Sequence, residues 1–266
     1  MKVTTRDIKK RKIRNERKQI SMLTCYDFQT AQILDQTELD IILVGDSVGN
    51  VILGYETTVE VSLQDMITFG AAVKRGAKNK FTVVDLPFGT YSCLKTAVTN
   101  AKKLFQETKA EALKLEGGFP FQLEIIERLT QIGIPIMGHI GLTPQSVHQQ
   151  GGYYTHGKTL SDEERLKAEA KALEKAGCFA IVLECVTPST SEQITNDLEV
   201  PTIGIGSGQM TDGQVLVTND LLKMGKTTPP SFCKPVADLY EVKKGLIENY
   251  LSQFKSYEGL DQQVLT

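Results

Sequence analysis

The sequence predicts a single-domain (β/α)8 barrel, or TIM barrel, of the α/β class. The chain has 266 residues, a length that such barrels commonly reach as one domain. Short apolar runs alternate with helical stretches along the whole sequence, and this order implies a parallel sheet covered by helices. Roughly eight strand–helix units in about 250 residues fit a closed barrel better than an open doubly wound sheet. The open sheet remains the alternative, because the eighth unit is weak.

The predicted strands are short apolar runs at residues 20–25, 40–44, 81–84, 110–115, 134–137, 179–183, 201–205 and 215–217. Helices are predicted between them and after them, at 28–37, 63–75, 95–108, 123–131, 162–176 and 240–250. Ser62 precedes the second of these helices, and Asp65 three residues later nearly completes a capping box. A long polar, glycine-containing stretch at 141–158 is predicted to be a loop.

The barrel domain is predicted to cover residues 19–255, between a basic helical segment at 1–18 and a loose C-terminal tail at 256–266. The basic segment gathers Lys and Arg around Ile8 and Ile13. It could be an arm that binds nucleic acid, but the whole chain has a formal net charge of −2. A balanced chain favours a helix that caps one end of the domain.

The composition points to a soluble protein. Hydrophobic residues make up 41% of the chain, which is enough for a substantial core, and no apolar run approaches the length of a membrane span. The first residues lack the apolar centre of a signal peptide. Five cysteines without paired short spacings argue against a disulfide framework or a zinc site. We therefore expect a reduced, cytoplasmic protein without a nucleic-acid or membrane partner.

Polar and acidic residues follow nearly every predicted strand. In barrels of this type, catalytic groups lie at the carboxyl ends of the strands. The strand ends of this chain carry Tyr26-Asp27, Gly45-Asp46-Ser47, Asp85-Leu86-Pro87, Lys114-Leu115-Glu116, Gly138-His139, Glu184-Cys185 and the turn at 204–208. Five or six such ends in register predict a ring of active-site residues.

Three of these acids, Asp46, Asp85 and Glu116, come from consecutive strands and have no cysteine or histidine cluster beside them. Hard oxygen ligands of this kind suit Mg²⁺. The alternative is that the aspartates cap the helices or turns that follow them. Lys114 and Glu116 are two residues apart, so they project from one face of their strand. The acidic surroundings keep Lys114 protonated, which favours binding of an anion over Schiff-base chemistry.

Glu184, His139 and Ser207 complete the candidate site. Glu184 ends the apolar run 180–183 and can act as a general base; a buried structural acid is the other interpretation. His139 is either a structural donor or a site contact. Ser207 lies in a glycine-rich turn of the kind that holds phosphate in many barrels, although such turns also let the backbone bend.

Longer motifs resemble those of the ketopantoate hydroxymethyltransferase family. The resemblance runs from about residue 20 to about residue 220 and depends on the motifs Leu43-Val-Gly-Asp-Ser47, Asp85-Leu-Pro-Phe88, Lys114-Leu-Glu-Gly-Gly118, Gly138-His-Ile-Gly-Leu-Thr-Pro-Gln-Ser146, Gly151-Gly-Tyr153, Leu183-Glu-Cys-Val186, Gly204-Ile-Gly-Ser-Gly208 and Asp212-Gly-Gln214. It implies a (β/α)8 barrel that uses Mg²⁺ and 5,10-methylenetetrahydrofolate. Such an enzyme transfers a hydroxymethyl group to 3-methyl-2-oxobutanoate and gives 2-dehydropantoate for the pantothenate route.

The resemblance also implies roles for individual residues. Asp46 and Asp85 would coordinate the metal, and Glu116 would hold it more distantly through water. The oxo acid would contact the metal-site aspartates together with Ser47 and Lys114, and Glu184 would accept the proton whose loss gives a metal-stabilised enolate. Tyr26, His139 and Ser207 are possible additional contacts. The family assembles as a homodecamer of two stacked pentameric rings.

Three segments depart from the family pattern: Thr68-Phe-Gly70, Tyr153-Tyr-Thr-His-Gly157 and the stretch 226–236. Two other functions stay open at this point. One is a Mg²⁺ barrel of the isocitrate-lyase or phosphonopyruvate-mutase kind that acts on another 2-oxo acid, although the cysteine-containing loop usual there has no counterpart here. The other is a barrel that has lost catalysis and serves as a binding or scaffold protein.

Overall fold

Eight parallel strands close into one barrel in the computed structural model of the chain, which describes residues 3–12 and 19–255. The strands follow chain order around the barrel, and β1 pairs with β8 to close it. They are β1 Ile20–Thr24, β2 Ile41–Val44, β3 Phe81–Asp85, β4 Ala112–Glu116, β5 Ile136–Gly141, β6 Ala180–Glu184, β7 Thr202–Ile205 and β8 Gly213–Leu216. The closed barrel confirms the predicted fold class and excludes the open sheet.

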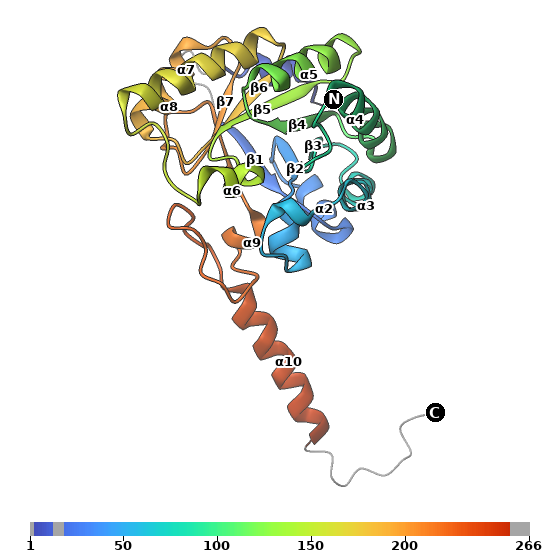
Figure 1. The fold of residues 1–266 in the computed structure, drawn as a ribbon. Helices are drawn as coiled ribbons and strands as arrows, with labels where there is room; N and C mark the ends of the chain where they lie inside the picture. Colours follow the sequence, from blue (N-terminus) through green and yellow to red (C-terminus); the bar gives the residue numbers. More distant parts are fainter. Residues whose placement is uncertain (1–2, 13–18, 256–266) are drawn as a thin grey trace. The chain divides into compact units, whose positions relative to one another are not determined.

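Helices lie around the outside of the barrel strands (Figure 1). They are α2 Phe28–Asp35, α3 Leu63–Gly76, α4 Leu94–Thr108, α5 Pro120–Gln131, α7 Leu160–Lys175 and α8 Pro188–Asp197. Short helical turns occupy the connections: Gly49–Leu53 and Thr58–Glu60 after β2, then Pro144–Ser146 and α6 Val147–Gln150 after β5. The predicted capping box is present, because the Ser62 side chain accepts from the Asp65 N–H while the Asp65 side chain accepts from the Ser62 N–H.

Several elements differ from the prediction: β5 ends at Gly141 rather than at residue 137, and the predicted loop at 141–158 contains the turn Pro144–Ser146 and helix α6. Helix α8 was not predicted, and its sequence explains why: Ser, Thr, Asn and Asp, which favour caps and turns over helix interiors, fill most of it. Pro188 at its first turn and the buried Ile194 nevertheless give it a start and a packed face. Strand β8 begins two residues before the predicted start, because Gly213 already pairs with Ile203 of β7 and Ile20 of β1.

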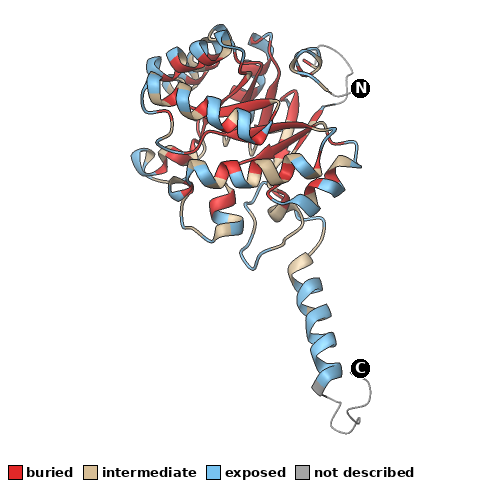
Figure 2. Cartoon of the chain, turned by 90° about the vertical axis from the view of Figure 1, so that its right-hand side faces the viewer, coloured by how far each residue is buried: buried red, intermediate tan, exposed pale blue. Residues whose placement is uncertain are grey.

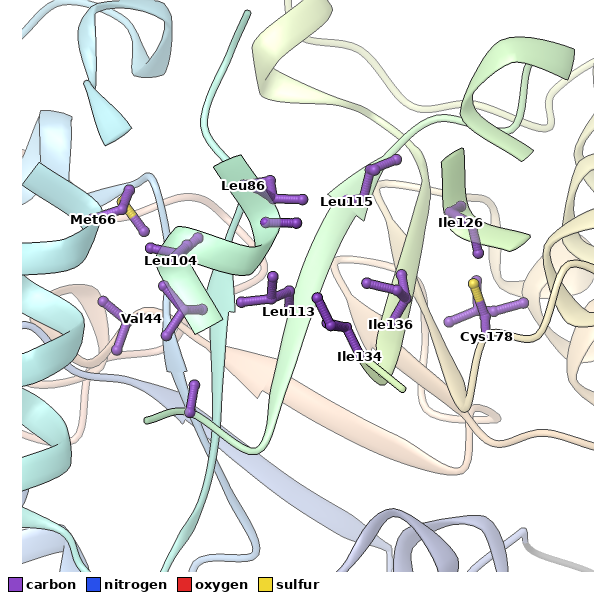
Figure 3. Close-up of a cluster of buried hydrophobic side chains, with 14 of the residues drawn as sticks. Val44, Met66, Leu86, Leu104, Leu113, Leu115, Ile126, Ile134, Ile136 and Cys178 are labelled. Carbon is purple, nitrogen blue, oxygen red and sulfur yellow. The ribbon is translucent and has the colours of Figure 1, made fainter. Parts of the chain in front are cut away.

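The strand side chains alternate between two apolar layers. On β2, Ile41 and Leu43 belong to the layer inside the barrel, whereas Ile42 and Val44 belong to the layer between strands and helices. Figure 3 shows the outer layer around β4 and β5, where Leu113, Leu115 and Ile136 lie with Met66, Leu104 and Ile126 of the surrounding helices. Each fully buried leucine or isoleucine contributes roughly 1.5–3 kcal/mol. Figure 2 shows the strands as almost continuously buried.

The amino-terminal segment packs against the interior layer. Helix α1, Thr5–Lys9, buries Ile8 in the same cluster as Ile20 and Phe81. The buried Lys12 donates from Nζ to the Asp212 carboxylate at 2.9 Å. Residues 13–18 of the predicted basic segment, and the predicted tail at 256–266, lie outside the described residues.

Asp40 joins this segment to the barrel and provides a stability prediction. Its carboxylate accepts from the Ser21 N–H and the Ser21 hydroxyl, both at 2.8 Å, and pairs with Arg11. Burial, the largest influence, opposes the charge on Asp40, but Ser21 and Arg11 outweigh it and hold the pKa below its ordinary value of 3.8. We expect Asp40→Asn to lower the free energy of unfolding in urea at pH 7 by about 1–2 kcal/mol.

Because the pKa of folded Asp40 is depressed, the charged form stabilises the protein above the ordinary pKa of 3.8 and loses this effect as pH falls through the folded pKa. The difference between wild type and Asp40→Asn should therefore be constant from pH 7 to pH 5 and shrink below about pH 4. Asp197→Asn, at a half-exposed aspartate 3.5 Å from Lys171, is the matched control and should change little. An equal loss in the two variants would contradict the role of Asp40.

The chain divides into two compact units, the first ending at Val217 and the second beginning at Thr218. The described part of the second unit contains α9 Thr218–Leu221 and α10 Leu239–Lys255. The loop between them is held at both ends, because the Val236 N–H donates to the Leu221 carbonyl at 2.9 Å and Lys223 pairs with Asp238. In the part of the chain that the structure describes, no helix has the length and apolar character needed to cross a membrane.

Candidate active site

Strand alternation places five polar side chains inside the barrel at its carboxyl end. Phe81 and Val83 belong to the interior layer, so Asp85 on the same face of β3 points inward as well. The same two-residue step carries the interior faces of β4, β5 and β6 to polar residues. The five residues are Asp85 on β3, Lys114 and Glu116 on β4, His139 on β5 and Glu184 on β6.

The register of the sheet pairs four of these residues directly. Asp85 is the partner of Lys114, and Glu116 is the partner of His139. The Lys114 ammonium lies 3.2 Å from Asp85 Oδ2 and 4.0 Å from Glu116 Oε1. Lys114 and Glu116 thus share a face, as predicted, but the closer carboxylate to Lys114 is that of Asp85.

Asp46 enters the cluster from the loop after β2. Its N–H donates to Asp85 Oδ2 at 3.1 Å, and all three predicted metal-site acids, Asp46, Asp85 and Glu116, are buried. Among the strand-end aspartates it is Asp27 that caps a helix, because its carboxylate accepts from the Thr30 N–H at the start of α2. The Asp46 carboxylate instead accepts from the Gln145 amide at 2.7 Å, and the Asp85 carboxylate accepts from the Asp46 N–H and pairs with Lys114.

The acids of the cluster perturb one another. Burial, followed by the charges of Asp85 and Glu116, raises the pKa of Asp46, and burial raises the pKa of Asp85. For Lys114, burial is the largest influence and by itself lowers the pKa, but the three carboxylates outweigh it and the pKa is raised. Lys114 is therefore a cation held among three carboxylates.

His139 connects the cluster to Glu184. Its Nδ1 lies 3.3 Å from both Lys114 Nζ and Glu116 Oε1, and its Nε2 lies 3.2 Å from Glu184 Oε2. Burial and the Lys114 charge lower the pKa of His139, but Glu116 and Glu184 raise it to about 9 overall. The Glu184 side chain is 19% exposed, against 3% for Glu116. Glu184 is thus the carboxylate of the group that a substrate can reach most easily.

The donor set fits a divalent cation that prefers oxygen ligands. Asp85 Oδ1 is buried without a hydrogen-bond partner in the described chain. Burial and, after it, the like charges of Asp85 and Glu116 raise the pKa of Asp46, and a dication would relieve this repulsion. No three acidic, histidine or cysteine side chains among the described residues are arranged to enclose a metal by themselves. Mg²⁺ suits such a site, since it commonly takes one or two carboxylates and completes its shell with water and substrate oxygens.

Tyr26 and Ser47 form a hydroxyl pair next to the acids. Their oxygens lie 2.7 Å apart, and burial is the main reason that the pKa of Tyr26 is raised. Gly45 leaves room for this arrangement, because a Cβ there would lie 2.9 Å from Ser47 Oγ and 3.6 Å from Asp85 Oδ2. The structure thus brings the predicted contact Tyr26 and the predicted substrate residue Ser47 together.

Ser207 lies behind Glu184 rather than in the acid cluster. Its hydroxyl donates to the Leu183 carbonyl at 2.7 Å and accepts from the Val186 N–H at 3.0 Å. Between these two contacts, Cys185 has φ of 48°, in the left-handed region that non-glycine residues rarely adopt. The Ser207 hydroxyl therefore fixes the turn that directly follows Glu184.

We expect Ser207→Ala to lower the turnover number by about 10-fold with little change in KM, because a small displacement of a reacting side chain costs rate more than binding. Steady-state kinetics together with a thermal melt would measure both effects. Ser191→Ala is the matched control, since the Ser191 hydroxyl is buried and has no hydrogen-bond partner among the residues that the structure describes. If kcat fell equally in the two variants, the turn would have no special role.

The segment that departs from the family pattern, 153–157, reaches the same turn. The His156 N–H donates to the Cys185 carbonyl at 2.8 Å, and the Thr187 N–H donates to the His156 carbonyl at 2.9 Å. The Tyr153 side chain is largely exposed. Its partial burial and the charge of Glu184 raise its pKa. This loop is therefore joined by its backbone to the residues that follow Glu184.

Two residues in the site were not predicted as functional. Gln145 donates from Nε2 to Asp46 Oδ2 at 2.7 Å, and Tyr91 donates to Gln145 Oε1. Gln145 lies within one of the family-like motifs, 138–146, which could have drawn attention to it. Tyr91 had no comparable signal, because its role depends on a contact with a residue 54 positions away.

The barrel and its inward-facing acids first define a class of protein, the (β/α)8 barrels with an acidic site at the carboxyl ends of the strands. The fold is similar to that of 2,3-dimethylmalate lyase, a member of the PEP mutase/isocitrate lyase superfamily, with a TM-score of 0.61 over 98% of this chain and 92% of that chain at 14% identity. It is also similar to the phosphoenolpyruvate phosphomutase from Streptomyces platensis subsp. rosaceus, with a TM-score of 0.64 over 96% and 88% at 9% identity. At these identities the similarity establishes the architecture alone.

Sequence relatives then identify the family. The pattern of the ketopantoate hydroxymethyltransferase family matches residues 2–258. The 3-methyl-2-oxobutanoate hydroxymethyltransferase of Syntrophus aciditrophicus (strain SB) is 45% identical over 98% of this chain and 95% of its own length. The protein of the same name from Thermotoga maritima is 46% identical over 94% and 92%. The chain belongs to the ketopantoate hydroxymethyltransferase family and is a transferase, which confirms the predicted resemblance.

Proposed function

We propose that this chain transfers a hydroxymethyl group from 5,10-methylenetetrahydrofolate to 3-methyl-2-oxobutanoate in a Mg²⁺-dependent reaction and so makes 2-dehydropantoate. The proposal depends mainly on one arrangement of acids. A buried cluster of three acids and one lysine reaches as far as β4, and the more accessible Glu184 lies on β6, two strands further around the barrel. Family membership supplies the reaction class, and this arrangement supplies the groups that the reaction needs.

The oxo acid carries a carboxylate beside a keto oxygen. Lys114, a permanent cation among the acids, would bind the substrate carboxylate, and the Ser47 hydroxyl would donate to a substrate oxygen. Asp46 and Asp85 would hold Mg²⁺, with Glu116 more distant and acting through water, and the metal supplies Lewis acidity at the keto oxygen when bound. The carboxylate and the keto oxygen of the substrate would therefore lie at the polar end of the barrel interior.

Glu184 would then accept the proton from C3 of the oxo acid. Its position 3.2 Å from His139 Nε2 limits the orientations of its carboxylate, and the turn held by Ser207 limits its backbone. A base fixed in this way typically contributes about 10²- to 10⁴-fold to the rate. Carbon C3 forms a bond to the methylene carbon donated by the folate, water supplies the hydroxyl oxygen, and tetrahydrofolate leaves.

The direct test mixes purified protein with 3-methyl-2-oxobutanoate, 5,10-methylenetetrahydrofolate and Mg²⁺, and measures tetrahydrofolate and 2-dehydropantoate. We expect both products in equal amounts, and neither when the oxo acid or the metal is left out. A folded protein that makes neither product would contradict the proposal and favour the two other functions considered above.

We also propose that the chain assembles as a decamer of two pentameric rings. Helix α10 supports an assembly, because it exposes apolar side chains that a subunit contact would bury. They include Leu246, Ile247, Tyr250, Leu251 and Phe254. Sedimentation velocity should give ten times the 29.4 kDa chain mass, and a monomer at micromolar concentration would contradict the proposal.

A further inference from the structure

Gln145 contacts two of the three acids of the cluster. Its side-chain Nε2 donates to Asp46 Oδ2 at 2.7 Å, and its backbone N–H donates to Glu116 Oε2 at 3.1 Å. Nε2 also donates to the Leu86 carbonyl at 3.0 Å, just after β3. One residue of the loop after β5 thereby links the carboxyl ends of β2, β3 and β4.

Tyr91 determines which way the Gln145 amide faces. The Tyr91 hydroxyl donates to Gln145 Oε1, and both side chains are buried. A flipped amide would place Oε1 against the Asp46 carboxylate and the Leu86 carbonyl, which are acceptors, and would lose two hydrogen bonds. The three contacts use both Nε2 hydrogens and the carbonyl oxygen, so the network fixes a single orientation.

These contacts anchor one oxygen of each carboxylate. Gln145 engages Asp46 Oδ2 and Glu116 Oε2, and the Asp46 N–H engages Asp85 Oδ2. Of the opposite oxygens, Asp85 Oδ1 is buried without a hydrogen-bond partner in the described chain, and Glu116 Oε1 lies 3.3 Å from His139 Nδ1. The anchored oxygens fix the direction of each carboxylate, and Asp85 Oδ1 is the oxygen left for a cation.

We propose that Gln145, oriented by Tyr91, is a positioning residue that sets the acid cluster for its cation and thereby for the oxo acid. The inference rests on the proposed function and extends it to two residues that would contact neither the substrate nor the metal. Groups that orient metal-binding side chains typically change metal affinity or activity by about 10- to 100-fold when they are replaced.

The test uses Mn²⁺ as the probe, because electron paramagnetic resonance distinguishes free Mn²⁺ from bound Mn²⁺. We expect Gln145→Leu to raise the Kd for Mn²⁺, measured with 3-methyl-2-oxobutanoate present, by about 10- to 100-fold. Tyr91→Phe removes one hydroxyl and should cause a smaller rise. The KM for 5,10-methylenetetrahydrofolate should stay at the wild-type value in both variants.

Two comparisons separate positioning from general loss of stability. Gln150→Leu is the matched control, since the Gln150 amide lies on the same segment but donates to Thr143 Oγ1; it should bind Mn²⁺ like wild type. In a double-mutant cycle, Tyr91→Phe should have no further effect on Mn²⁺ binding once Gln145 is leucine, because Tyr91 acts through Gln145. Thermal melts of all variants show how far stability has changed.

The outcomes separate the two proposals. If wild type exchanges the C3 proton of the oxo acid and folded Gln145→Leu keeps the wild-type Kd for Mn²⁺, the inference about Gln145 is wrong while the proposed function stands. Additive effects of the two substitutions would also overturn it. If Gln145→Leu does not fold, Tyr91→Phe decides: a raised Kd supports the inference and an unchanged Kd overturns it. A wild type that neither binds nor exchanges the oxo acid overturns both proposals.

Discussion

Replacing Glu184 with glutamine is expected to slow the exchange of the C3 proton of 3-methyl-2-oxobutanoate for deuterium by about 10²- to 10⁴-fold. The amide keeps the size of the side chain but cannot accept a proton. Exchange in D2O with Mg²⁺ present, followed by proton NMR without folate, isolates this step from carbon–carbon bond formation. Binding of the oxo acid and Mg²⁺ should persist, because Glu184 is the most exposed acid of the site and lies outside the buried cluster.

Glu192→Gln is the matched control for this prediction. Glu192 is an exposed glutamate on α8, the helix that follows Glu184 in the chain. It should exchange the C3 proton at the wild-type rate. Exchange by folded Glu184→Gln at the wild-type rate would mean that another group is the base, and His139, which contacts Glu184, would be the next residue to test.

The barrel could be predicted because its strands are short, apolar and evenly spaced. The alternation within each strand also predicted that Lys114 and Glu116 share one face, since a two-residue step along a strand returns to the same side. The same step from Val83 places Asp85 inside, and from Val182 it places Glu184 inside. The alternation of residues along each strand was thus enough to predict most of the side chains of the candidate site that point into the barrel.

The remaining features depend on contacts between distant parts of the chain. The bond from Gln145 to Asp46 joins residues 99 positions apart, and periodicity within either segment carries no information about it. The left-handed conformation of Cys185 depends on Ser207, which comes from the next strand–turn unit. Helix α8 forms from residues of poor helix propensity because tertiary packing of Ile194 compensates.

Residue chemistry at the strand ends could not by itself choose among related barrels. An acid-rich carboxyl end suits several Mg²⁺-dependent reactions of 2-oxo acids, and the similar folds found at 9–14% identity share only the architecture. The longer motifs distinguished this family from related barrels, because they include loop residues such as Gln145 and Ser207 that a barrel does not require. In this structure those loop residues make the contacts that orient Asp46 and Glu184.

Asp46→Asn and Asp85→Asn are expected to weaken Mg²⁺-dependent binding of 3-methyl-2-oxobutanoate together, by about 100-fold each. An asparagine retains one carbonyl oxygen but loses the negative charge that holds a dication. In Asp46→Asn the Gln145 amide still has an oxygen to donate to. The loss of affinity therefore reports the missing charge and not a disturbed fold. In Asp85→Asn the Lys114 ammonium also loses its nearest carboxylate, 3.2 Å away.

Titration calorimetry of the oxo acid with and without Mg²⁺ separates these effects. Asp65→Asn is the control, because Asp65 belongs to the capping box at the start of α3 and should change stability without changing the metal dependence. If both site variants bound the oxo acid with wild-type affinity and the same Mg²⁺ dependence, Asp46 and Asp85 could not be metal ligands. If only Asp85→Asn lost affinity, and lost it without Mg²⁺ as well, Asp85 would act mainly by holding Lys114. A joint loss confined to the Mg²⁺-containing experiment is the result expected when both aspartates hold one cation.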